Sequence, residues 1–63
     1  MSKVRDVLKG LNPTRRVNIV DIDFDPLEEG PAAGLLAESM YLDSAAIYIE
    51  NDFPYLIVVG ESF

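Results

Sequence analysis

The stretch "YLIVV", from Tyr55 to Val59, decides how this 63-residue chain folds. Its side chains do not alternate between apolar and polar, which is typical of a strand that is buried on both faces or between neighbours. A strand of that kind belongs in the centre of a sheet. We therefore expect it to have one neighbouring strand on each side.

The segments before this strand supply its two neighbours. Residues 45–50, "AAIYIE", suit a strand, and the turn "NDFP" joins them to Tyr55 as a hairpin. Residues 15–24, "RRVNIVDIDF", are rich in β-branched and aromatic side chains and suit another strand. Pro31 can open a helix through residues 32–42, and a right-handed crossover then makes the first and last strands parallel. The predicted strand order is 1-3-2, which leaves residues 45–50 at an edge that invites pairing with another chain.

The N-terminal segment has the pattern of a short helix over residues 3–9. Gly10 stands where such a helix ends, and Pro13 follows it. The apolar residues follow the i, i+3, i+4, i+7 spacing of one helical face, and they are Val4, Val7, Leu8 and Leu11.

Residues 25–30 combine a helix start with early helix breakers. Asp25 and Pro26 suit a cap and a first turn, but Gly30 and Pro31 arrive before a second turn can form. We expect a single turn there. The predicted fold is therefore α+β: a short N-terminal helix and then β-α-β-β, with a three-stranded mixed sheet in order 1-3-2 packed on one or two helices.

The composition is that of one small folded domain, residues 1–63. A hydrophobic content of 49% and a charged content of 25% argue against a disordered acidic tail. One core of this size supplies about 3 to 5 kcal/mol, and small scaffolds usually add disulfides, a structural metal or association. The chain has no Cys and no His, which excludes disulfides and the common zinc sites. Association with other chains is the remaining source of stability.

The charges divide the domain into a basic helical head, residues 1–16, and an acidic α+β body, residues 17–63. The head holds all five basic residues and one acid, so it carries +4. The body holds ten acids and no base, so it carries −10 and the chain carries −6. The head can lie on its own acidic body, or it can attract the body of another copy.

The stretch "VDIDFDPLEEG", residues 20–30, concentrates acids on a strand and the turn after it. A calcium-binding loop beginning at Asp21 would need Gly at its sixth position and Glu at its twelfth, and these positions hold Pro26 and Ala32. We therefore expect no metal site. Instead, we predict a face that docks basic side chains and consists of Asp21, Asp23, Asp25, Glu28 and Glu29. Asp25 should also cap the turn that begins at Pro26, whereas Asp21 and Asp23 have no predicted local role.

Enzyme activity, cofactors and nucleic-acid contacts are not expected. The chain has no His to activate a serine and no Cys to act as a nucleophile, so no nucleophilic dyad is visible. Its four glycines are isolated from one another, so no phosphate-binding loop is visible either. The net charge of −6 repels DNA and RNA. We see neither a signal peptide nor a run of about 20 apolar residues, and so we expect no membrane contact and a cytoplasmic protein, or one in the virion or host cytoplasm if it is viral.

These observations predict a non-enzymatic protein–protein interaction module. It would oligomerise or dock in a larger assembly, such as a viral or phage particle. The alternative is an acidic mimic of nucleic acid that inhibits a basic host protein, as anti-CRISPR-like phage inhibitors do. The expected partner is a protein, either a second copy or a complex with a basic surface. The predicted partner-binding residues are Arg15, Arg16, Asp21, Asp23, Asp25, Glu28, Glu29 and Phe63.

Two of these predictions specify contacts. Arg15 and Arg16 are adjacent on a strand and must point to opposite faces, so we expect one over the helical layer and the other available to a carboxylate of another chain. Phe63 has little chain after it, and we expect it to pack on a partner or on the last strand.

Overall fold

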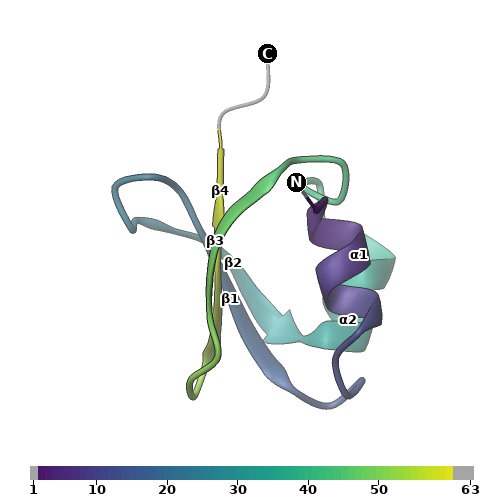
Figure 1. Ribbon diagram of the computed structural model, residues 1–63. Helices are drawn as coiled ribbons and strands as arrows, with labels where there is room; N and C mark the ends of the chain where they lie inside the picture. Colours follow the sequence, from purple (N-terminus) through teal and green to yellow (C-terminus); the bar gives the residue numbers. More distant parts are fainter. Residues whose placement is uncertain (1, 61–63) are drawn as a thin grey trace.

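The computed structural model describes residues 2–60 of the chain, which form two helices and four strands (Figure 1). In chain order these elements are α1 (Val4–Lys9), β1 (Arg16–Val20), β2 (Pro26–Pro31), α2 (Ala32–Glu38), β3 (Ala46–Glu50) and β4 (Tyr55–Val59). No helix in this part of the chain is long and apolar enough to cross a membrane.

The strands form one mixed sheet in the order β2-β1-β4-β3. The two central strands, β1 and β4, run parallel, and each pairs antiparallel with an outer strand. The predicted three-stranded sheet in order 1-3-2 is therefore wrong, because a fourth strand, β2, extends the sheet beyond β1. Tyr55 to Val59 does lie between two strands, as its continuous apolar sequence indicates.

The additional strand comes from the segment for which we expected one helical turn. β1 ends at Val20, and the chain reverses through residues 21–25 before β2 pairs back along β1. Proline removes a backbone donor, which a central strand cannot tolerate but an edge strand can. Because β2 lies at the edge of the sheet, Pro26 and Pro31 fit at its two ends.

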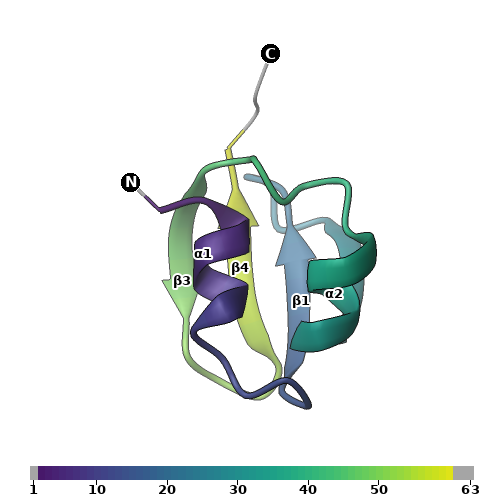
Figure 2. The same ribbon diagram turned by 90° about the vertical axis from the view of Figure 1, so that its right-hand side faces the viewer.

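Both helices cover the same face of the sheet (Figure 1). In Figure 2, α1 lies in front of β3 and β4, and α2 lies in front of β1. The core between helices and sheet is formed by Val4, Leu8, Val17, Ile19, Ala32, Leu35, Ala46, Ile57 and Val59. The turn of residues 21–25 projects on the opposite side of the sheet, where no helix of the described chain lies (Figure 1).

The start of the chain is tied to the outer edge of β3. The backbone N–H of Ala46 donates to the carbonyl oxygen of Ser2 at 2.8 Å, and Lys3 forms an isolated antiparallel bridge with Ala45. This contact continues into α1, since the N–H of Val4 donates to the carbonyl of Ser44 at 3.0 Å. The beginning of the basic head, residues 2–4, therefore packs beside the start of β3.

Candidate functional site

The acids of residues 21–25 lie in a tight turn and not along a strand. The Oδ1 atom of Asp21 accepts hydrogen bonds from the backbone N–H groups of Asp23 at 2.9 Å and Asp25 at 3.0 Å. Phe24, inside this turn, has a positive φ of 64°. Two predictions are therefore wrong: Asp21 does have a local role, and Asp25 caps no helical turn because Pro26 begins a strand.

The turn brings three carboxylates together. One oxygen atom from each of Asp21, Asp23 and Asp25 lies within 4.8 Å of the other two. Asp23 and Asp25 are exposed to solvent, which screens their mutual repulsion. The group is thus a compact negative surface at the tip of the β1–β2 hairpin.

Replacing Asp21 by alanine should lower the free energy of unfolding by about 1–2 kcal/mol, because two backbone donors lose their acceptor. Asp21→Asn keeps the Oδ1 acceptor and should lower the free energy of unfolding by less. Asp23→Ala is the matched control, since its side chain makes no hydrogen bond within residues 2–60. Urea unfolding of the three variants measures the difference, and equal effects at positions 21 and 23 would show that the Asp21 carboxylate does not hold the turn.

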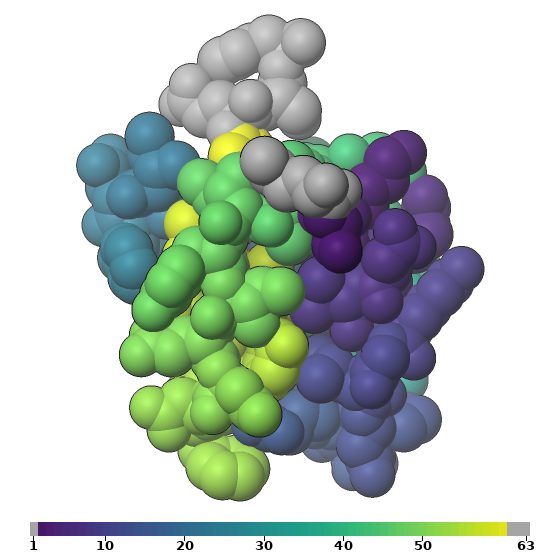
Figure 3. All heavy atoms as spheres, in the orientation of Figure 1, coloured from purple at the N-terminus to yellow at the C-terminus, as the bar shows by residue number. Residues whose placement is uncertain are grey.

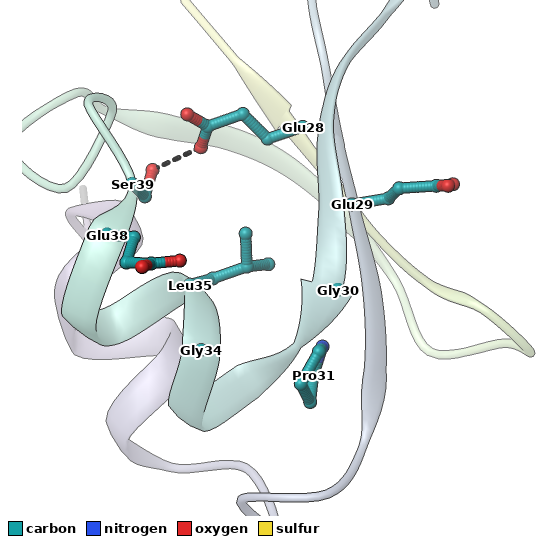
Figure 4. Close-up of a pocket in the computed structure, with 8 residues that line it drawn as sticks. All are labelled: Glu28, Glu29, Gly30, Pro31, Gly34, Leu35, Glu38 and Ser39. Carbon is teal, nitrogen blue, oxygen red and sulfur yellow. Dashed lines mark hydrogen bonds between the residues drawn. The ribbon is translucent and has the colours of Figure 1, made fainter.

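Glu28 and Glu29 lie on opposite faces of β2 (Figure 4). Glu28 points toward the helices, where its carboxylate accepts from the Ser39 hydroxyl at 2.5 Å and from the Met40 N–H at 3.3 Å. Glu29 points away from them (Figure 4). The five acids predicted to form one docking face therefore do not share a surface.

A groove of about 380 Å³ lies between β2 and α2 (Figure 4). The Leu35 side chain points from α2 toward β2, and Glu28 and Glu38 also line the groove (Figure 4). The remaining lining residues are Glu29, Gly30, Pro31, Gly34 and Ser39. The groove therefore offers carboxylate acceptors and contains no basic residue.

Arg15 lies against the β3–β4 turn and not over the helical layer. Its guanidinium donates to Oδ1 of Asn51 at 2.9 Å and to the carbonyl oxygen of Asp52 at 2.7 Å. The same group stacks on Phe53, with its central carbon 4.5 Å from the ring centroid, and lies 5.2 Å from the centroid of Tyr55. The prediction that one arginine lies over the helices is thus not met by Arg15, which links the chain before β1 to the far hairpin.

Arg16 is exposed and lines a shallow groove of about 330 Å³ with Asn18, Glu29, Phe53 and Pro54. It forms no ion pair within the described chain, where the one salt bridge joins Arg5 and Asp43. That pair links the head to the body within one copy. Lys3 and Lys9 stay exposed and unpaired among residues 2–60.

The surface also carries large hydrophobic side chains that the predicted site did not include. They are Ile22, Phe24, Met40, Ile47, Tyr48, Ile49 and Phe53, with exposures between 39% and 85%. Three of them are consecutive on β3, an edge strand. The sequence "AIYIE" indicates these exposed side chains, because its apolar residues do not alternate with polar ones. A two-layer domain covers only one face of its sheet, so some of these side chains must stay exposed.

Phe63, the last predicted partner-binding residue, lies outside the described residues. No protein-family model matches the chain, and neither a curated protein nor a solved structure matches it.

Proposed function

We propose that this chain is a non-enzymatic interaction module that associates with further copies of itself. The observation that supports this function is the edge strand β3, on which three consecutive apolar side chains are exposed, those of Ile47, Tyr48 and Ile49. Fully burying a side chain of this size contributes about 1.5–3 kcal/mol. A second copy that packs along this edge would supply part of that burial, and a small domain with neither Cys nor His gains stability from it.

One further observation favours the alternative of an acidic nucleic-acid mimic. The three carboxylates at the projecting β1–β2 turn form a compact negative group, as phosphates do along a nucleic acid. Such a mimic would stay small on its own and bind a basic protein. Its binding would fall steeply with salt, because exposed charges are screened within about 10 Å at 0.1 M ionic strength.

The mass in solution, measured over a range of protein concentrations at low and at high salt, tests the proposal. We expect the dimer fraction to rise with protein concentration and to persist at high salt, since apolar burial drives it and salt screens repulsion between two copies of charge −6. A monomer at every concentration would contradict self-association. A monomer that binds a basic protein at low salt, and releases it at high salt, would support the mimic.

A further inference from the structure

The two edges of the sheet differ in how open they are to another strand. The β2 edge begins with Pro26 and ends with Pro31, neither of which can donate to a new ladder, and Glu28 and Glu29 lie between them. Proline and charged side chains are the usual means by which proteins protect an edge from pairing. The β2 edge is therefore closed to a partner strand.

The β3 edge lacks this protection over most of its length. Ser2 and Lys3 cover its beginning at Ala45 and Ala46, but no backbone hydrogen bond outside the β3–β4 ladder reaches Ile47, Tyr48 or Ile49 in the described chain. These three side chains are 45%, 51% and 39% exposed. β3 is the strand nearest the viewer in Figure 1, and its atoms lie in the foreground of Figure 3.

We propose that β3 is the contact surface of the self-association, and that it pairs antiparallel with β3 of a second copy about a two-fold axis. This inference rests on the proposed function and specifies its interface. The new ladder would run over residues 47–50, along which the one further backbone hydrogen bond of the described chain is that from the Asp52 N–H to the Glu50 carbonyl at 3.0 Å. It would satisfy the free backbone groups and join the two sheets into one.

The charges at the ends of β3 favour the antiparallel direction. Lys3 lies beside Ala45 at the start of the strand, and Glu50 ends it. Antiparallel pairing brings Glu50 of each copy toward Lys3 of the other, so opposite charges meet twice. Parallel pairing would place the two Glu50 carboxylates side by side, where like charges repel. Both residues are exposed, and neither has an ion pair within residues 2–60.

A charge exchange tests this interface. Lys3→Glu and Glu50→Lys should each weaken dimerisation about 2- to 30-fold, because each change removes two symmetric ion pairs of modest strength. The double variant Lys3→Glu with Glu50→Lys should recover most of the parent affinity. Lys9→Glu, an equal change of charge on an exposed part of α1, is the control and should leave the dimer unchanged.

A thiol supplies a second measurement. Because the chain has no cysteine, Ile49→Cys introduces a unique thiol near the two-fold axis, where disulfide geometry requires Cα atoms within about 7 Å. We expect rapid oxidation to a covalent dimer, whereas Glu29→Cys on the β2 edge should oxidise slowly. If the parent associates but neither the charge exchange nor the position of the thiol matters, β3 pairing is wrong and self-association stands. If the parent does not associate, both proposals fail.

Discussion

Replacing Ile57 by alanine should remove most of the free energy of unfolding of this domain. Ile57 is fully buried in β4, the strand that pairs with both β1 and β3. Truncating a buried isoleucine to alanine costs about 2–5 kcal/mol, from lost transfer free energy and the cavity that remains. A single small core supplies about 3–5 kcal/mol, so one such cavity removes most of the stability.

Circular dichroism during urea unfolding measures this loss. Met40→Ala is the matched control, because Met40 is 80% exposed and its truncation removes few contacts. It should change the free energy of unfolding by less than about 0.5 kcal/mol. The prediction is wrong if Ile57→Ala unfolds cooperatively with a free energy of unfolding within about 1 kcal/mol of that of the parent. The core would then have relaxed around the missing atoms, and no cavity would remain.

The central position of β4 was predictable from its continuous apolar sequence. Five consecutive apolar residues favour a position between two strands, and β4 lies there with its last three residues buried. The N-terminal helix was predictable for a related reason, since its periodic apolar face packs Val4 and Leu8 into the core.

The β1–β2 hairpin was not predictable from the same rules. Pro26, Gly30 and Pro31 are helix and strand breakers in isolation, and they fit β2 only because the sheet has an edge there. The reversal before β2 depends on Asp21, whose carboxylate holds two backbone N–H groups. A local acceptor of that kind is hard to distinguish in sequence from an acid that only faces solvent.

Glu28 and Glu29 do not lie on one face, because they belong to a strand and not to a helical turn. We assigned Glu28 and Glu29 to one turn, where both could face a partner, but neighbours on a strand point to opposite faces. Glu28 consequently contacts Ser39 at the end of α2, and Glu29 faces away. Whether the exposed acids bind a partner stays a prediction.

Replacing Arg15 by alanine should lower the free energy of unfolding by about 1.5–3 kcal/mol. The change removes two hydrogen bonds from a charged group and its stacking on Phe53. The Nε atom of Arg15 is buried and has no hydrogen-bond partner among residues 2–60, which lowers the net contribution of the side chain below the sum of its contacts. Arg15→Lys should restore part of the loss only, because an ammonium lacks the planar fork that donates while it stacks.

Arg16→Ala is the control that the chain itself supplies, one residue away. Arg16 is exposed and makes no ion pair within residues 2–60, so its removal should change stability by less than about 0.5 kcal/mol. Urea unfolding of the three variants would separate the two arginines. Equal losses at positions 15 and 16 would contradict the structure, because only Arg15 joins the chain before β1 to the β3–β4 turn. Through that contact, a residue of the basic head fixes the turn beside the β3 edge, and Arg15→Ala should therefore also weaken self-association while Arg16→Ala leaves it unchanged.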